Sequence, residues 1–171
     1  DETLARTAEM IAKRISVDAC SIYIYDSDRG ILILKATHGL DPSTIETVHM
    51  LPSEGLVGLV LERSAPVQES QMQNHPRFKA FPQTKEDSFS SFLGVPLIEH
   101  RRSFGVLVVH TTDPRTFSPQ EVQLLGSIAT QISSLVSKAL LMKELDLSLI
   151  HISEPTRRYA ISYAGVGVKK K

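Results

Sequence analysis

Side chains capable of catalysis are present in this sequence, but their types and spacing favour no particular reaction. Five of the six histidines are scattered without the short paired spacing of metal ligands: His38, His49, His75, His100 and His110. The single cysteine, Cys20, lies in an expected strand with no neighbour that would lower its pKa. Ser90 and Ser91 have no identifiable base and are interpreted as strand-entry residues. We therefore predict no catalytic residue, no metal site and no cofactor, and expect that this chain is not itself an enzyme.

Composition bounds the class of protein before any element is assigned. A chain of 171 residues, 42% of them hydrophobic, suits one domain with its own core. One cysteine excludes an intrachain disulfide and fits a reducing compartment. We expect no segment apolar and long enough to span a membrane, and there is no secretory signal at Asp1. We expect a soluble, cytoplasmic protein that contacts no membrane.

The last residues differ in character from the rest of the chain. Residues 147–157, LSLIHISEPTR, resemble an in-frame translation of a transposase-type sequencing adapter, and ISYA at 161–164 matches that adapter's next constant segment. We interpret residues 147–171 as a non-native, disordered tail that follows a domain over 1–146; the alternative is a genuine basic tail. The tail holds five of the 19 basic and one of the 19 acidic side chains, so 14 basic and 18 acidic residues remain, a net charge of −4. A mildly acidic domain without a basic stripe is not expected to bind nucleic acid.

Two strands joined by a charged turn are expected at the centre of the domain. Residues 90–110, SSFLGVPLIEHRRSFGVLVVH, hold two apolar runs, and the charged residues between them, 99–102, belong in solvent. The second run is continuous rather than alternating, so both faces of its strand should be covered. Pro96 removes one ladder donor, which indicates a bulge or an edge position.

Apolar periodicity and turn residues predict the elements around this centre. Residues 2–17 carry one apolar stripe at helical spacing, and a capping box at Ser118 and Glu121 begins a long helix. Residues 70–88 are irregular with short helical turns, and we expect them to form a packed lid. The remaining expected elements are strands at 20–25 and 31–37, short helices at 41–48 and 56–62, an edge strand at 65–69, and the long helix from 119 to about 145.

These segments, in this order, resemble those of GAF domains, a family of small sensor modules. The segments that carry the resemblance are CSIYIYD, LKATHGL, EGLVGLVLE, NHPRFKAFP, FLGVPLI and FGVLVVH. Together they are similar to the N-terminal GAF domains of bacterial nitrogen-related phosphoenolpyruvate–protein phosphotransferases, over about residues 4–145. The resemblance implies an α+β fold, in which the terminal helices pack on one face of an antiparallel sheet. Short helices and a lid then cover a pocket on the other face.

The resemblance also implies that a ligand would bind between the sheet and the lid. For the aromatic candidates the alternative is ordinary core packing. If a dicarboxylate binds, Arg77 and Lys79 are the nearest cations, and the alternative for both is a solvated surface charge. The candidate ligand-binding residues are Tyr23, His38, Gly58, Glu69, Gln73, Phe78, Phe81, Phe92 and Gly94.

Some members of the family require residues that this sequence lacks. Bilin-binding members attach their chromophore through a lid cysteine, and members that reduce methionine sulfoxide need several cysteines; here residues 70–88 contain none and the chain has one. The asparagine-lysine-phenylalanine motif of cyclic-nucleotide-binding members is also absent. The resemblance therefore points to metabolite sensing or protein regulation.

The function implied by the resemblance is regulatory. We expect a domain that senses a small metabolite of the glutamine or 2-oxoglutarate class. The signal would pass through the helix that begins at Pro119, either to a downstream effector domain or across a homodimer formed by the terminal helices. The alternative is a ligand-free dimerisation or signal-relay module of a sigma-54 activator or a histidine kinase.

Overall fold

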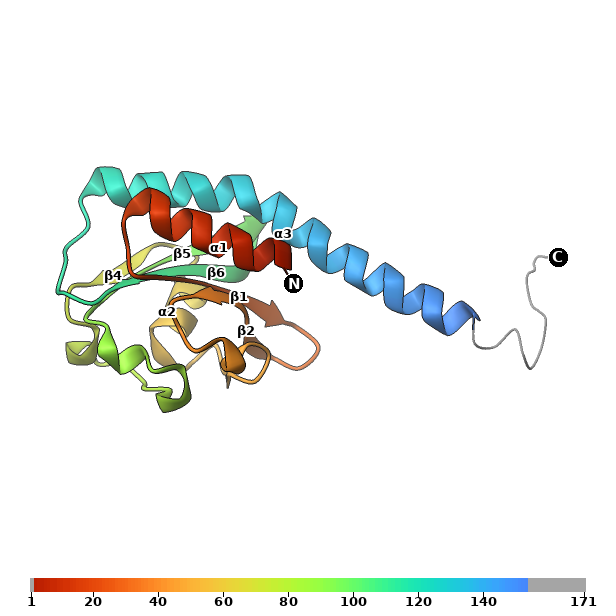
Figure 1. Cartoon of the computed structure of the whole chain (residues 1–171), viewed down its shortest axis with the longest axis horizontal. Coiled ribbons are helices and arrows are strands. Elements are labelled where there is room, and N and C mark those ends of the chain that lie inside the picture. The colour runs from red at the N-terminus through yellow and green to blue at the C-terminus, as the bar shows by residue number, and fades with distance from the viewer. Residues whose placement is uncertain (1, 154–171) are drawn as a thin grey trace. The chain divides into compact units, whose positions relative to one another are not determined.

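A computed structural model describes the backbone of residues 2–153 and the side chains of residues 2–145. Its centre is a six-stranded antiparallel sheet in the order β3-β2-β1-β6-β5-β4 (Figure 1). The α+β class expected from the sequence is therefore confirmed. The strands are β1 (Ala19–Asp26), β2 (Ile31–His38), β3 (His49–Met50), β4 (Val67–Glu69), β5 (Ser91–Glu99) and β6 (Arg102–Thr111).

The hairpin of β5 and β6 lies in the middle of the sheet, as predicted. Its two-residue turn is formed by His100 and Arg101, which both have positive φ, 53° and 65°. Two successive positive φ angles are what a type I′ turn requires, and this turn matches the twist of the flanking strands. The apolar run of β6, residues 106–109, is fully buried because β6 pairs with β1 and β5 and is covered on both faces. The register shift in β5 falls between Leu97 and Ile98, just after Pro96.

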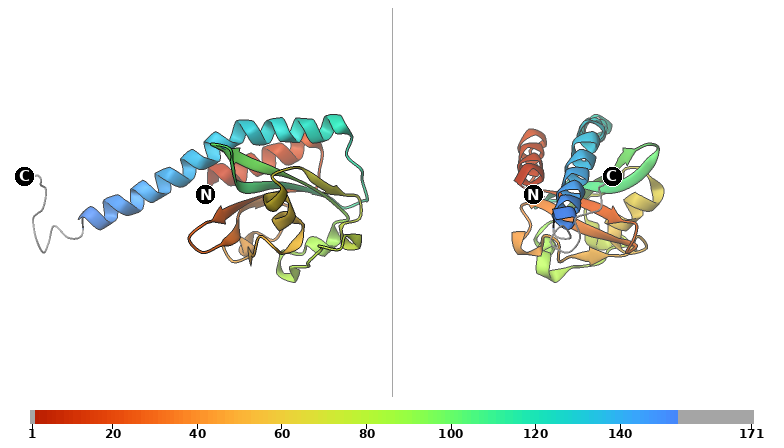
Figure 2. Two further views of the ribbon diagram at one scale, coloured as in Figure 1. Left: turned by 180° about the vertical axis from the view of Figure 1, so that it is seen from behind. Right: turned by 90° about the vertical axis from the view of Figure 1, so that its right-hand side faces the viewer.

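Helices cover both faces of this sheet. Figure 2 shows α1 (Glu2–Ile15) and the first part of α3 (Pro119–Ser153) on one face and α2 (Gly55–Arg63) on the other. The predicted stripe of α1 is buried in full: Leu4, Ala8, Ile11, Ala12 and Ile15. On α3, Leu125, Ile128 and Ala129 are buried, so this first part of the helix belongs to the core of the domain.

The start of α3 is fixed by the predicted capping box. The Ser118 hydroxyl accepts the Glu121 N–H at 3.1 Å, and the Glu121 carboxylate accepts the Ser118 N–H at 2.9 Å. Two orphan donors of the helix terminus are thereby satisfied. Arg115 pairs with Glu121 and lies 4.6 Å from the centre of the Phe117 ring. These contacts fix where α3 begins relative to the sheet.

One predicted helix is wrong: residues 41–48 form only a 3₁₀ turn, η1 (Pro42–Thr44), before β3. Asp41 caps this turn as expected, since its carboxylate accepts the Ser43 N–H at 3.0 Å. Beyond it the backbone pairs with β2 instead of continuing a helix. The Glu46 N–H donates to the Leu34 carbonyl at 2.7 Å, and Glu46 has a φ of 69°. Sheet pairing has overridden the local helix signal.

The chain divides into two compact units, residues 1–133 and 134–171, and each is described by itself. In the second unit α3 continues to Ser153, beyond the end predicted near Leu145 and through the first residues of the segment interpreted as a tail. The rest of that segment, residues 154–171, lies outside the described residues.

The expectation that nothing in the chain is long and apolar enough to span a membrane is wrong. Within the described residues, Pro119–Leu145 meets that test by length and composition, with a mean hydropathy of 1.3 over its best window. No charged residue occurs between Val122 and Ser137. The polar residues among the apolar ones in this stretch are uncharged, so the mean hydropathy of the helix stays high. A core helix of a soluble protein passes the same test, and Leu125, Ile128 and Ala129 are indeed buried in the domain.

Candidate ligand-binding site

A cavity lies between the α2 face of the sheet and residues 70–88, which we call the lid. The space between its atoms is about 300 Å³, and part of it is open to solvent. Only about 20 Å³ of this space can be reached by the centre of a water molecule. In this conformation the cavity therefore has room for about one water molecule. Its walls are formed by Met50 of β3, Gly55, Leu56 and Val57 of α2, Met72, Phe78, Lys79, Phe81 and Glu86 of the lid, Phe92 of β5 and His110 of β6.

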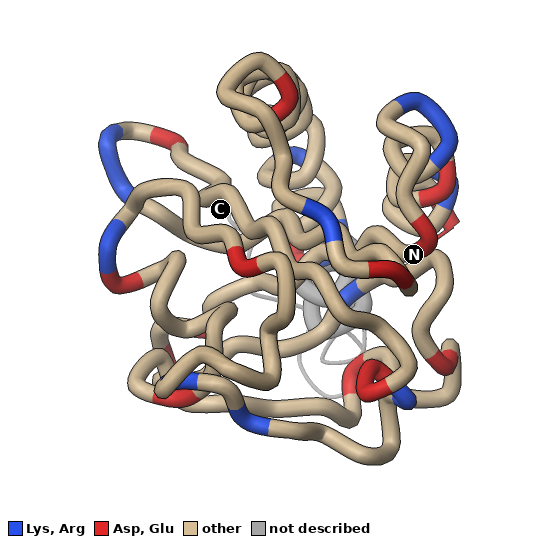
Figure 3. The backbone as a smooth tube through the Cα atoms, turned by 90° about the vertical axis from the view of Figure 1, so that its left-hand side faces the viewer, with Lys and Arg blue, Asp and Glu red and all other residues tan. Residues whose placement is uncertain are grey.

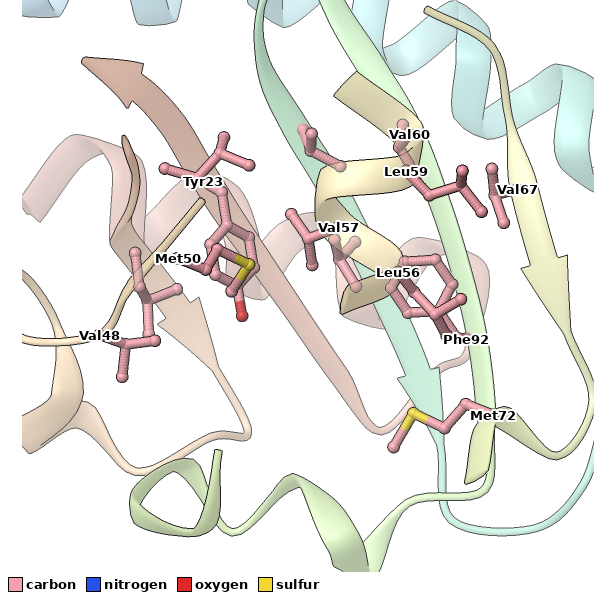
Figure 4. Close-up of a cluster of buried hydrophobic side chains, with 14 of the residues drawn as sticks. Tyr23, Val48, Met50, Leu56, Val57, Leu59, Val60, Val67, Met72 and Phe92 are labelled. Carbon is pink, nitrogen blue, oxygen red and sulfur yellow. The ribbon is translucent and has the colours of Figure 1, made fainter. Parts of the chain in front are cut away.

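The cavity is an extension of the main hydrophobic core. Figure 4 shows Leu56 and Val57 of α2 facing Phe92, with Met72 below them and Tyr23 and Met50 on the opposite side. Phe92 is fully buried, whereas Phe78 and Phe81 of the lid are partly exposed and pack on the same cluster. Three of the predicted aromatic residues thus line the cavity, two of them from the lid.

Glu86 is the one carboxyl among these walls. It lies in the 3₁₀ turn η4 (Glu86–Ser88) and is only 8% exposed. Its Oε1 accepts the Phe81 N–H at 3.3 Å, which closes the lid on itself. Burial raises the pKa of Glu86 to about 7; the Phe81 N–H opposes this shift, and the charge of Asp87 adds to it. Most carboxyl groups in proteins are ionised near neutral pH, so a carboxyl that is half protonated there is unusual.

His110 faces the same cavity from the end of β6 and is 1% exposed. Its Nδ1 lies 3.0 Å from the Ser91 carbonyl oxygen, which can only accept, so Nδ1 carries the proton and Nε2 is an acceptor. The ring stacks on Phe89 at 5.5 Å and meets Phe92 edge-on at 5.7 Å between ring centres. Burial lowers the pKa of His110 to about 4, so the imidazole is neutral at physiological pH.

Two ion pairs fasten the lid to α2 and the turn before it. Arg77 pairs with Glu62 at 2.8 Å and donates to the carbonyls of Pro52 and Gly55, at 3.3 Å each. Lys79 pairs with Glu54, and its Nζ lies 5.5 Å from the centre of the Phe81 ring. The Leu51 N–H and then Lys79 hold the pKa of Glu54 below its usual value. The two cations considered for a dicarboxylate therefore already have a carboxylate partner, although the buried Nε–H of Arg77 has no hydrogen-bond partner.

The other sequence-predicted candidates are not among the residues that line the cavity. Tyr23 is buried in the core beside it, and burial raises the pKa of its hydroxyl, with the charge of Glu86 adding to the shift. Gly58 and Gly94 are packing positions: a Cβ would collide with the Pro52 carbonyl at Gly58, and with Val60 and Phe92 at Gly94. His38 ends β2, Glu69 ends β4, and the exposed Gln73 donates to the Phe89 carbonyl at 2.8 Å.

Sequence reasoning did not select Glu86 and His110 for the site. Glu86 stands in the charged run TKED, which is typical of a solvated loop, so nothing in the pattern marks it as buried. His110 did carry a signal, because it directly follows the continuous apolar run of β6 and a strand covered on both faces buries its last residues too.

No further chemistry is apparent around the site. Cys20 is buried, and burial raises its pKa, so its thiol is held in the neutral form. Among the residues that the structure describes, no group of three His, Cys, Asp or Glu side chains is placed to hold a metal ion. Figure 3 shows acidic and basic residues interspersed along the chain.

This chain belongs to the GAF domain family: a model of that family matches residues 1–136, most of the chain. Among solved structures it is similar to the GAF domain of a phosphoenolpyruvate-protein phosphotransferase from Coxiella burnetii. The TM-score is 0.77 and the identity 28%, over 84% of this chain and 85% of that one. The corresponding domain from Acinetobacter gives a TM-score of 0.73 and 33% identity, over 82% and 84%.

Curated relatives point to the same group of proteins. The chain is 38% identical over 129 residues to a protein described as "Phosphoenolpyruvate-dependent phosphotransferase system" from Escherichia coli (strain K12), and equally to its counterpart from Salmonella typhimurium. The match covers 75% of this chain but 17% of each relative, so the chain spans about a sixth of their length. The predicted resemblance to phosphotransferase GAF domains is confirmed.

The family match also bears on catalysis. A GAF domain is a regulatory fold, which agrees with the prediction that this fragment is not an enzyme. A free methionine-R-sulfoxide reductase from Thermoplasma acidophilum shares the fold, with a TM-score of 0.68, but at 22% identity the likeness extends to the fold alone.

Proposed function

We propose that this GAF domain is the metabolite-sensing, regulatory part of a phosphoenolpyruvate–protein phosphotransferase of the nitrogen-related phosphotransferase system, and that it works in the cytoplasm. The observation that carries the proposal is the cavity under the lid, with two buried polar groups in apolar and aromatic walls. The similarity to phosphotransferase GAF domains supports the parent protein. The ligand would be a small metabolite of the glutamine or 2-oxoglutarate class.

The lid is the element that a ligand would move. Because the cavity has room for about one water molecule, a metabolite must displace the lid residues Phe78 and Phe81 to enter. The lid follows β4 directly, and Gln68 of β4 is hydrogen-bonded to the backbone of Phe117, two residues before α3. Lid movement would therefore reach the start of α3, which would pass it to an effector domain or to a second copy of the chain.

A second candidate is a ligand-free dimerisation or signal-relay module of a sigma-54 activator or a histidine kinase. The observation that favours it is the small size of the cavity, which is nearly filled by Phe78, Phe81 and Phe92. The exposed apolar side chains Leu141, Met142 and Leu145 of α3 would suit a homodimer formed by the terminal helices. In neither case do we propose that the domain binds nucleic acid or a membrane.

Isothermal titration calorimetry of the 171-residue chain with L-glutamine and with 2-oxoglutarate tests the first candidate. Saturable binding of either metabolite supports the sensor. If neither metabolite gives a heat of binding and sedimentation shows that the chain is a stable dimer, the relay module is favoured instead. The genomic sequence beyond residue 146 tests the parent protein: a phosphotransfer domain with a phosphorylatable histidine is expected there, and a kinase or AAA+ domain would contradict it.

A further inference from the structure

The polar groups of the cavity differ in what they leave available to a ligand. Lys79 lines the cavity but pairs with Glu54, and Arg77 pairs with Glu62 and two backbone carbonyls. Both ion pairs hold the lid, so a ligand carboxylate that takes over either charge must replace a carboxylate of the protein. Both cations therefore already have a carboxylate partner, and the one buried donor without a hydrogen bond among the described residues, the Nε–H of Arg77, belongs to a residue that does not line the cavity.

The hydrogen-bond acceptors of the cavity, in contrast, are not all occupied by protein groups. Glu86 forms no ion pair with any described residue, and the hydrogen bond from the Phe81 N–H occupies only Oε1. His110 donates through Nδ1 to the Ser91 carbonyl, which leaves Nε2 as an acceptor without a described protein partner. An anionic ligand would face the lone pair of His110 and, in the molecules in which Glu86 is ionised, a carboxylate, and both would repel it.

We propose, as a narrowing of the sensor function above on which it rests, that the cavity recognises a small molecule through an N–H donor group presented to Glu86 and His110, with a protonated amine bound most strongly, and that the dicarboxylates of the metabolite class named there are rejected. The aromatic side chains Phe78, Phe81 and Phe92 surround this group with apolar or π surface. Such walls favour a compact ammonium or amide group over a strongly hydrated anion.

Binding of a cation is then linked to the protonation of Glu86. A cation favours the carboxylate form, and with a pKa of about 7 that form grows from about one tenth of the molecules at pH 6 to nine tenths at pH 8. The neighbouring titratable groups do not obscure this change. His110 has a pKa of about 4, burial raises the pKa of Tyr23, and Asp87 lies next to Glu86 as a second acid. Lys79 of the cavity wall is paired with Glu54.

The test is an NMR titration of the ¹⁵N-labelled 171-residue chain with three probes: ethylammonium, propionamide and succinate. Ethylammonium is expected to shift the amides of residues 78–89 saturably, with about tenfold higher affinity at pH 8 than at pH 6. Propionamide should bind more weakly and without pH dependence. Succinate should leave these amides unchanged.

Two variants separate Glu86 from its surroundings. Glu86→Gln keeps an oxygen for the Phe81 N–H, and it should weaken ethylammonium binding at least tenfold at pH 8 and abolish the pH dependence. Asp87→Asn, which removes the adjacent exposed charge, should bind nearly as the parent chain does. If Glu86→Gln folds poorly, the pH dependence of the parent chain carries the test by itself.

The contrary results are distinct from a failure of the proposed function. Saturable binding of succinate under the lid, with no effect of ethylammonium, overturns the inference and leaves the sensor intact. Amine binding that is equal at pH 6 and pH 8 and survives Glu86→Gln also overturns it. No response to any of the three probes refutes the inference, and the sensor falls as well only if the metabolite titrations above show no binding.

Discussion

Gln68 and Phe117 exchange two hydrogen bonds although they are 49 positions apart in the chain. The Gln68 Nε2 donates to the Phe117 carbonyl at 3.3 Å, and the Phe117 N–H donates to the Gln68 Oε1 at 3.0 Å. The side-chain amide thus pairs with backbone as a neighbouring strand would, at the open edge of β4. It joins the strand that leads into the lid to the residue that precedes the capped start of α3.

Gln68→Ala should destabilise the domain by about 1–3 kcal/mol, because it leaves a part-buried N–H and carbonyl of Phe117 without their partners. Urea unfolding followed by circular dichroism measures this change. The matched control is Gln131→Ala, an exposed helical position where the free energy of unfolding should change by less than about 0.5 kcal/mol. Equal effects of the two variants would show that the Gln68–Phe117 contact does not hold the start of α3.

Two helical glycines should respond to alanine with opposite signs. At Gly58 of α2 a Cβ would meet the Pro52 carbonyl, so Gly58→Ala should destabilise the domain by about 1–3 kcal/mol despite its better helix propensity. At Gly126 of α3 no atom lies within 4 Å of the added Cβ, so Gly126→Ala should stabilise it by about 0.5–1 kcal/mol. Thermal unfolding of both variants measures the difference, and a stabilising Gly58→Ala would contradict the close approach of α2 to residue 52.

Glu86 and His110 should give opposite pH dependences of stability. Between pH 4.5 and about 7 the folded chain holds a proton on Glu86 that the unfolded chain releases, so the free energy of unfolding falls as pH rises. Between about pH 4 and 6.5 the unfolded chain binds a proton on His110 that the folded chain does not. Because of this group, the free energy of unfolding rises with pH. Each slope is at most about 1.4 kcal/mol per pH unit, and they largely cancel in the parent chain.

Removing one group should therefore expose the slope of the other. Between pH 4.5 and 6.5, Glu86→Gln is expected to gain stability with rising pH relative to the parent chain, and His110→Asn to lose it. Chemical unfolding of the three proteins at several pH values in this range measures the slopes, which do not depend on how much each variant is destabilised overall. Parallel curves for all three proteins would contradict the burial of both groups.

Arg77→Ala should loosen the lid without unfolding the domain. The variant loses the ion pair to Glu62 and the hydrogen bonds to the Pro52 and Gly55 carbonyls, and the amides of residues 75–81 should exchange about tenfold faster, equivalent to about 1.4 kcal/mol. Arg63→Ala, next to Glu62 but exposed, is the matched control. Hydrogen exchange read by mass spectrometry separates the two; equal protection of the lid in both variants would show that Arg77 is not its main fastening.

The parts of the fold that follow from local periodicity could be predicted from the sequence. The stripe of α1, the central hairpin and the capping box at Ser118 and Glu121 are as expected, because each depends on neighbours a few residues apart. Residues 41–48 were expected to form a helix and do not, because the Glu46 N–H pairs with Leu34 of β2, a contact invisible to local propensity.

The site was less accessible to prediction than the fold. Phe78, Phe81 and Phe92 were chosen as large apolar residues in the right segments, and they line the cavity. Glu86 was not chosen, because only the folding of the lid removes its carboxyl group from water. Arg77 and Lys79 were correctly placed in the lid, but their partners, Glu62 and Glu54, lie far away in sequence and engage their charges.

The measurement that tests the central claim most directly is hydrogen exchange of the lid in the 171-residue chain, with and without saturating L-glutamine or 2-oxoglutarate. If the cavity is a metabolite site, one of these compounds should slow exchange in residues 70–88 several-fold and leave the β1–β6 core unchanged. Unchanged exchange of the lid with both compounds would contradict the account and favour a domain that relays signals without a ligand.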